Sequence, residues 1–247
     1  MTRPTAAHST LHVSAGVLLL SALLALSGCR QGSDDGTDGV DDRPSAAAFD
    51  VAEALSHADP APYSAAVTMT TTVAGSPTVS QGRLNLNGPV TGRLTVRDPR
   101  NGVSDMRYTG ERAYVRFRQD DGLPGRWNAL PVPAGGRVHL GNLTGYAALL
   151  AGRPGADKGP ERTAGLAVRR LSGTVTTGEL AKLDPDVYGD MTADHIRSFD
   201  CEIWVTAQGR VVRFERSLVS GDRGPIRTVV TLSRFGAPEE TTAPVNP

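Results

Sequence analysis

The sequence predicts an α+β domain in which antiparallel strands carry most of the chain. Two long stretches, residues 63–130 and 196–235, alternate apolar and polar side chains with a period of two. Such alternation is typical of strands with one buried and one solvated face. Turn signals such as Asn87-Gly88 separate the alternating segments. A few segments of helical periodicity lie before and between the two stretches, so we expect helices that pack on one face of the sheet.

The amino terminus has the layout of an export signal. It holds one basic residue, Arg3, and no acidic one, and residues 13–26 are almost wholly apolar. This run of about 14 residues is shorter than the roughly 20 that a membrane-spanning helix needs. It therefore fits a secretory signal better than a membrane span.

The residues after the apolar run indicate the type of signal. Leu26-Ser27-Gly28-Cys29 resembles the lipobox of bacterial lipoproteins, in which an aliphatic and two small residues precede a cysteine. The resemblance implies cleavage between Gly28 and Cys29 and a lipid on the Cys29 thiol. Two acyl chains hold a protein stably on a bilayer, at roughly 0.8 kcal/mol per buried CH₂. We expect a covalent lipid anchor at the cell membrane, on its extracytoplasmic side; ordinary secretion with an unused Cys29 is the alternative.

A spacer follows the signal peptide of residues 1–28. Residues 30–45 hold five aspartates and one aliphatic side chain, too little apolar surface to offset the entropy of the chain. The aspartates lack the spacing and the closing glutamate of a calcium-binding loop. We therefore expect residues 29–45 to form an acylated, acidic tether, and residues 46–247 to form one folded domain.

The first half of this domain begins with a helix. Pro44 suits the first helical turn, and residues 46–58 carry an apolar stripe at helical spacing before Asp59-Pro60. Period-two alternation then covers residues 63–73, and shorter alternating segments follow around 84–86, 90–96, 106–108 and 113–117. Turns at this spacing predict an antiparallel meander.

The second half inserts helices before a second meander. Asn142 suits the cap of a helix over residues 143–150, and a loop is expected over 153–165. A strand over 168–175 and a short helix over 177–183 come next. Strands are predicted over 196–206, 210–219 and 226–235, and the proline-rich tail after Phe235 should be extended or loose.

Composition and motifs argue against most catalytic and metal-binding classes. Without residues 1–28 the chain keeps 25 basic and 26 acidic residues, which does not favour nucleic-acid binding. The three remaining histidines, His57, His139 and His195, have no metal-ligand spacing. No nucleophile elbow, phosphate loop or dinucleotide fingerprint occurs. The aspartates between residues 184 and 194 are interpreted as a solvated loop. We predict no enzyme activity, cofactor or metal; an envelope hydrolase is the least favoured hypothesis.

Cys201 is the second of two cysteines and has no partner for an intramolecular disulfide once Cys29 is acylated. Alternation places it on the same strand face as Phe199, Ile203 and Val205. This pattern predicts a buried, unreactive thiol rather than a reactive one.

The order of elements resembles the LppX/LprG-type lipoproteins of actinobacteria, which share a LolA/LolB-like half-barrel. Four stretches carry the resemblance across residues 46–240: Gly110-Glu-Arg-Ala-Tyr-Val-Arg116, Gly165-Leu-Ala-Val-Arg-Arg-Leu-Ser-Gly-Thr-Val175, Ile203-Trp-Val-Thr-Ala-Gln-Gly-Arg210 and Phe235-Gly-Ala-Pro238. It implies a strongly curved antiparallel sheet, an incomplete barrel, covered on its concave face by a few helices. It also implies an apolar cavity that takes lipid or glycolipid ligands. The basic strands near Arg93–Arg118 have no role that the resemblance assigns.

Two functions remain open from the sequence. The first is a membrane-anchored, non-enzymatic carrier or binder of lipid-like molecules in the cell envelope. The second is an interaction module with a filled core that binds a protein or cell-wall partner. Because alternate residues of a strand point to the same face, the apolar face of the strands should line any cavity. The inner sides of the helices should form the rest of the lining. These candidates are Val67, Met69, Leu94, Val96, Val115, Phe117, Leu149, Leu150, Leu180, Ile203, Val212 and Phe214.

The lipobox yields a direct prediction. The Cys29→Ala chain should carry no acyl group and should be either uncleaved or released, because only the thiol accepts the lipid. Metabolic labelling with palmitate measures this. Labelling of the variant as strong as that of the parent would show that the lipid is attached elsewhere.

Overall fold

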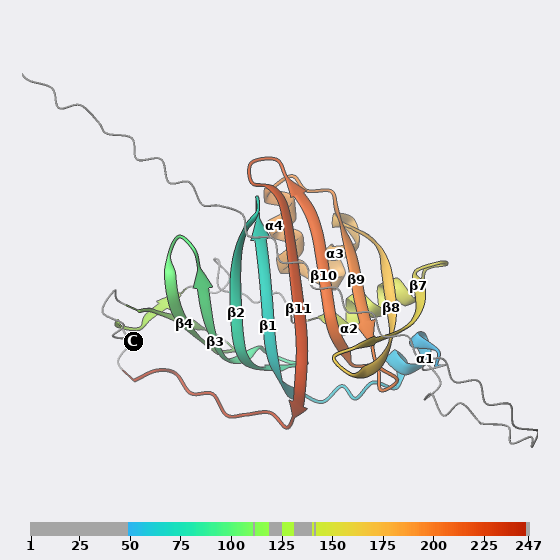
Figure 1. The fold of residues 1–247 in the computed structure, drawn as a ribbon, viewed down its shortest axis with the longest axis horizontal. Helices are drawn as coiled ribbons and strands as arrows, with labels where there is room; N and C mark the ends of the chain where they lie inside the picture. The colour runs from blue at the N-terminus through green and yellow to red at the C-terminus, as the bar shows by residue number, and fades with distance from the viewer. Residues whose placement is uncertain (1–48, 111, 119–124, 131–139, 141, 246–247) are drawn as a thin grey trace, which may run out of the picture. The chain divides into compact units, whose positions relative to one another are not determined.

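The computed structural model describes residues 49–110, 112–118, 125–130, 140 and 142–245, which form one sheet with helices on one side (Figure 1). The signal peptide, Cys29 and the acidic spacer lie outside the described residues. The strands are β1 (Tyr63–Val73), β2 (Ser76–Leu86), β3 (Thr91–Asp98), β4 (Gly102–Thr109), β5 (Ala113–Phe117), β6 (Asn128–Leu130), β7 (Asp157–Thr163), β8 (Leu166–Thr176), β9 (Ser198–Val205), β10 (Val211–Ser220) and β11 (Gly224–Gly236). In the described part of the chain, no helix is long and apolar enough to span a membrane.

The sheet consists of two meanders joined at one strand pair. Its order is β6-β5-β4-β3-β2-β1-β11-β10-β9-β8-β7, every neighbouring pair is antiparallel, and β6 and β7 do not pair to close a barrel. The joint is the pairing of β1 with β11, where Met69 lies opposite Val230. This confirms the predicted open, antiparallel α+β architecture.

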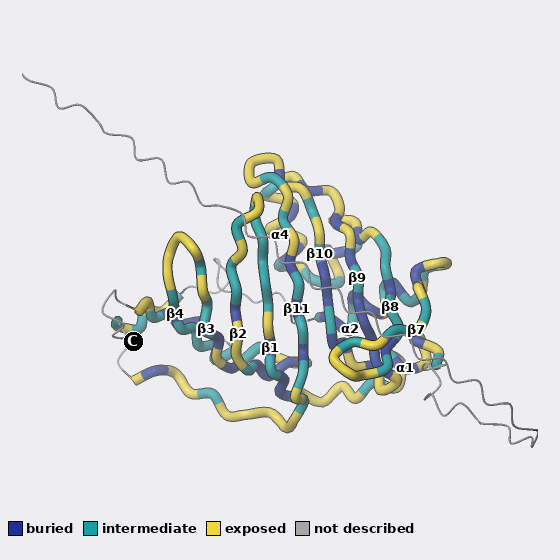
Figure 2. Tube along the Cα trace, viewed as in Figure 1, coloured by how far each residue is buried: buried dark blue, intermediate teal, exposed yellow. Residues whose placement is uncertain are grey.

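The described residues include four helices, α1 (Val51–Ser56), α2 (Leu143–Ala151), α3 (Thr177–Leu183) and α4 (Pro185–Ala193). Of these, α2, α3 and α4 lie on one face of the sheet, which we call the inner face, and α1 contacts α2. The helix α2 contacts β8 and β10, and α3 contacts β8 and α4. The main apolar core lies between these helices and the sheet, and buried residues concentrate along β9 and β10 (Figure 2).

Several segment boundaries differ from those predicted. Asp184–Asp194 is not a loop, because α4 occupies residues 185–193 with Pro185 in its first turn and the Asp184 side chain accepting from the Val187 N–H at 3.2 Å. The predicted loop over residues 153–165 contains the edge strand β7. The first helix is shorter than predicted: its described part begins at Val51, after Asp50 caps it.

Asn142 holds two helices together. Its side-chain oxygen accepts from the Gly145 N–H at 3.1 Å and caps α2, as predicted, while its side-chain amide donates to the Leu183 carbonyl at 2.6 Å at the end of α3. One side chain therefore satisfies a free donor at the start of α2 and a free acceptor at the end of α3.

We expect Asn142→Ala to lower the free energy of unfolding by about 1–2 kcal/mol, because both bonds are lost. Chemical denaturation measures the change. Asn128→Ala is the control: Asn128 is exposed on the edge strand β6, and its side-chain amide donates to a nearby carbonyl, that of Arg126, at 3.3 Å. Equal effects of the two substitutions would contradict the bridging role of Asn142.

Cys201 lies in the main core with 1% of its surface exposed. Burial raises the pKa of its thiol to about 12. Because the thiolate is the reactive form, this environment makes Cys201 unreactive.

In the Cys29→Ala chain, Cys201 is the single thiol. At about pH 8 an aromatic disulfide reagent should fail to modify it in the folded protein and should modify it fully after unfolding in guanidinium. The absorbance of the released thiolate measures both rates. Fast modification of the folded chain would mean that the core around Cys201 opens readily.

Candidate functional site

The candidate site begins with a row of inner-face residues across three strands. The β1 residue Met69 lies opposite Val230 of β11, and Val230 lies opposite Phe214 of β10. Because alternate residues of a strand share a face, the neighbours of this row at a spacing of two also face inward. Thr71, Thr228 and Arg216 therefore lie on the same face of the sheet, as does Leu218, two residues beyond Arg216.

A cavity of about 480 Å³ lies between these residues and α4. Val187 and Met191 contribute from α4, and Leu140 and Ile196 lie on the segments that flank the helices. The remaining lining is Met69, Thr71, Val73, Asp190, Ala193, Asp194, Phe214, Arg216, Leu218, Arg223, Ile226, Thr228 and Val230. The volume falls within the range of roughly 300–1,000 Å³ found for small-molecule sites.

Charged groups lie on the wall of this mainly apolar cavity. Arg216 extends from β10, and its Nε is buried without a hydrogen bond to any described residue. Its guanidinium lies 5.7 Å from the centre of the Phe199 ring. Burial lowers the pKa of Arg216, while the charges of Asp184 and Asp190 act in the opposite direction. Arg223 forms an ion pair with Asp194, so both charge signs line the site.

The Tyr146 hydroxyl links α2 to the start of α4. It donates to the Asp184 carboxylate at 3.1 Å, and Asp184 also caps α4. Burial is the first cause that raises the pKa of Tyr146, and the nearby Asp184 charge raises it further. The neutral phenol therefore serves as a hydrogen-bond donor that fixes the helix over the cavity.

The structure brings only two of the predicted lining residues to this cavity, Met69 and Phe214. Most of the others pack in the main core or against it: Val67, Leu94, Leu149, Leu150, Leu180 and Ile203. Val115 is also buried, on β5, but lies outside this cluster. Val96 is half-buried on β3, and Phe117, at the end of β5, is 51% exposed.

Val212 lies in a different place from the one predicted. A bulge between Val211 and Arg213 shifts the register of β10, so Val211 joins the main core. Val212 instead packs with Val168 and Trp204 in a small second cluster. The parity argument fails here because a bulge adds one residue to one strand and reverses the alternation.

Sequence reasoning missed most of the cavity. Val187 and Met191 were missed because the aspartate-rich segment was interpreted as a loop, although Asp184-Pro185 is a helix-start signal. Ile226, Thr228 and Val230 follow directly from period-two alternation of β11. Arg216 shares parity with Phe214, but a basic residue is rarely expected on a buried face.

The chemistry of the site suits binding of an amphiphile. Apolar side chains form most of the wall, and a few charged groups converge on it. No group of three or more metal-ligating side chains is found within the described residues. The arrangement can hold an apolar chain and contact a polar group at one end.

The similarities of this chain to known proteins are structural and distant. No protein-family model and no curated protein matches the chain. It is similar to the lipoprotein LppX of Mycobacterium tuberculosis, with 15% identity and a TM-score of 0.47 over 78% of this chain and 98% of that one. The chain is also similar to LprF of Mycobacterium bovis, with 16% identity and a TM-score of 0.45 over 78% of this chain and 96% of that one. For a LolA superfamily protein of Nitrosomonas europaea the identity is 10% and the TM-score 0.31, over 77% of this chain and 93% of that one. These are the types of protein that the sequence resembles, and the likeness is one of fold alone.

Proposed function

We propose that this protein is a membrane-anchored, non-enzymatic carrier or binder of lipid-like molecules in the cell envelope. The ligand lies between α4 and the inner faces of β1, β10 and β11. The observation that carries the proposal is the 480 Å³ cavity with its mainly aliphatic wall. The expected lipid at Cys29 holds the domain beside the membrane from which such a ligand comes.

The size of the cavity matches one acyl chain. Its volume is about sixteen times the roughly 30 Å³ that a water molecule occupies in the liquid, and a methylene group is of similar size. Burial of an apolar chain gains about 0.8 kcal/mol for each CH₂ removed from water. A single chain therefore gains enough free energy to bind without any specific polar contact.

The rival function is an interaction module with a filled interior. It draws support from the inner face beyond the cavity, where Leu171, Val175 and Ile203 have no exposed surface and pack in the main core. Mass spectrometry of an organic extract of the natively purified protein separates the two. A co-purifying acyl compound supports the carrier, and a clean extract at high yield favours the module.

A pair of substitutions on β1 tests the cavity directly. Met69→Trp should abolish binding of a fluorescent fatty acid with little change in melting temperature, because the indole enters empty space. Val67→Trp is the matched control, since Val67 lies on the same strand face but is 2% exposed in the packed core. Its larger side chain should cost about 1–3 kcal/mol of stability.

Fluorescence titration and thermal denaturation of the parent and both variants give the two readouts. If Met69→Trp is destabilised as strongly as Val67→Trp and the parent never binds the probe, the interior is filled and the carrier function is wrong.

A further inference from the structure

Three arginines face one another across three adjacent strands on the outer face of the sheet. Arg83 of β2 lies opposite Arg93 of β3, and Arg93 lies opposite Arg107 of β4. Like charges in directly opposed positions destabilise a sheet. Contacts with the carboxy-terminal tail offset this repulsion only in part: Arg83 pairs with Glu239 and Arg107 donates to the Thr242 carbonyl, whereas Arg93 has no such partner.

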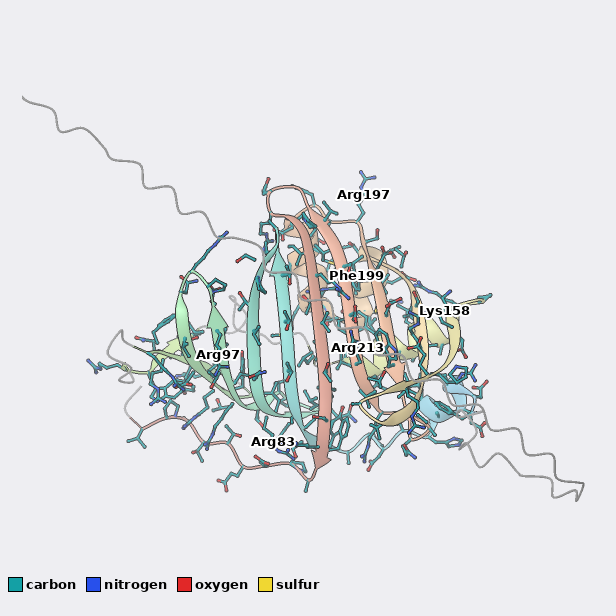
Figure 3. All side chains as sticks on the ribbon, viewed as in Figure 1. Arg83, Arg97, Lys158, Arg197, Phe199 and Arg213 are labelled. Carbon is teal, nitrogen blue, oxygen red and sulfur yellow. The ribbon has the colours of Figure 1, made fainter. Side chains whose placement is uncertain are left out.

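The row belongs to a larger basic face, defined here as Arg83, Arg93, Arg97, Arg107, Arg116 and Arg118 with Trp127. Two of its members, Arg83 and Arg97, are labelled in Figure 3. Asp105 accepts hydrogen bonds from Arg116 at 2.9 Å and from Arg118 at 3.0 Å. Burial would raise the pKa of Asp105, but these hydrogen bonds hold it below its usual range.

The carboxylates near this face leave three of its arginines without an ion pair. Arg83 pairs with Glu239 of the carboxy-terminal tail. Glu240 borders the same small hollow as Arg93 without forming an ion pair. Within the described residues, Arg93, Arg97 and Arg107 have no carboxylate partner: Arg97 bonds the Gln81 side chain at 3.4 Å and Arg107 the Thr242 carbonyl at 3.2 Å.

An aromatic side chain lies within the basic face. The guanidinium carbons of Arg107 and Arg116 lie 5.2 Å and 4.7 Å from the centre of the Trp127 ring. Tryptophan is enriched where a surface meets the headgroup region of a bilayer, because its ring is apolar and its N–H is polar. Arginine binds phosphate oxygens through its fork of N–H donors.

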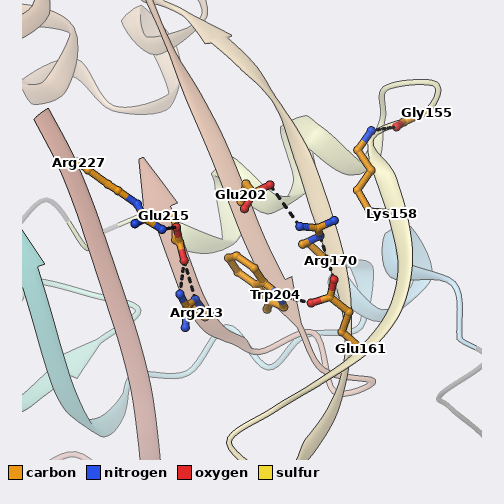
Figure 4. Close-up of polar contacts among 9 residues, drawn as sticks. All are labelled: Gly155, Lys158, Glu161, Arg170, Glu202, Trp204, Arg213, Glu215 and Arg227. Atoms are coloured by element: carbon orange, nitrogen blue, oxygen red, sulfur yellow. Dashed lines mark hydrogen bonds and ion pairs between the residues drawn. The ribbon is translucent and has the colours of Figure 1, made fainter. Parts of the chain in front are cut away.

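The other half of the outer face is charge-balanced (Figure 4). Glu215 of β10 pairs with both Arg213 and Arg227. Arg170 of β8 pairs with Glu161 and Glu202, and Glu161 also accepts from the Trp204 indole at 2.8 Å. These arginines of β8, β10 and β11 therefore have carboxylate partners, unlike Arg93, Arg97 and Arg107.

We propose that the basic face docks on the phosphate groups of an anionic lipid bilayer. Arginines without ion pairs supply the charge complementarity, and Trp127 supplies a side chain suited to the interface. The expected anchor at Cys29 would keep this face near a bilayer, so weak docking suffices to orient the domain. The cavity opens on the inner face, so the two sites lie on opposite faces of one sheet.

The two tryptophans of the chain make the test specific, since each lies on one half of the outer face. In the Trp204→Phe chain the tryptophan fluorescence comes from Trp127 alone, and in the Trp127→Phe chain it comes from Trp204 alone. Each full chain is reconstituted into vesicles of phosphatidylcholine, with or without phosphatidylglycerol, that carry a headgroup-level quencher. Trp127 should be quenched only when phosphatidylglycerol is present, and Trp204 should stay unquenched in both lipids.

Charge reversal supplies the matched control. Arg93→Glu in the Trp204→Phe chain should weaken docking by about fivefold or more, since each basic residue near an anionic surface contributes about that factor. Arg197→Glu makes the same change of charge at an exposed site far from the basic face (Figure 3) and should have no effect. The neutral Arg93→Gln should also weaken docking while keeping or raising the melting temperature, because it relieves the repulsion.

Three results would overturn the proposal. They are equal quenching of Trp127 in both lipids, equal effects of Arg93→Glu and Arg197→Glu, and binding of soluble polyphosphate without vesicle docking. Fatty-acid binding measured on the same variants should be unchanged. A chain that docks but binds no fatty acid would refute the carrier function and leave the docking surface intact.

Discussion

The pairing of β1 with β11 is the interaction on which the rest of the structure depends. It joins the first meander to the last across most of the chain length, and its two strands have 11 and 13 residues. Closing so long a loop costs entropy that local hairpins do not pay. The row Met69, Val230 and Phe214 crosses this joint. Because the cavity straddles it, neither meander alone would form the candidate site.

The inner face of the sheet is close-packed in one part and lines a cavity in another. Under α2 and α3 the side chains of β8 and β9 are close-packed, and Leu171 and Ile203 have no exposed surface. Beside α4, apolar side chains from β1, β10 and β11 surround open space instead. The half-buried Arg216 on this wall costs desolvation, which lowers its pKa, and the nearby charges of Asp184 and Asp190 offset part of that cost. The fold is thus stabilised at one end and left open at the other.

Sequence periodicity predicted the antiparallel sheet and the Asn142 cap, because these depend on local pattern, whereas the open form of the sheet was expected from the resemblance to LppX/LprG-type lipoproteins. It failed where one residue changes the pattern or where composition hides it. The bulge at Val211 moved Val212 out of the main core. Aspartates hid the helix α4, and Pro160 with its charged neighbours hid the edge strand β7. The choice between cavity and core could not be predicted, since it depends on how closely α4 approaches β10 and β11, and both outcomes use the same apolar residues.

Alternation also separates the chemistry of the two faces. Leu94 points into the core while its neighbour Arg93 points outward, so the outer charges can change without altering the packing inside. On β10 that freedom is used to pair Glu215 with two arginines, where burial would raise the pKa of Glu215 but their hydrogen bonds lower it. On β2–β4 the opposite arrangement stands: Arg83, Arg93 and Arg107 repel one another across the strands. Carboxylates neutralise arginines on one half of the sheet, and the same kind of pairing would be possible on the other half. Glu239 compensates Arg83, but Arg93 and Arg107 have no carboxylate partner among the described residues, and the proposed bilayer would supply the counter-charge for these two.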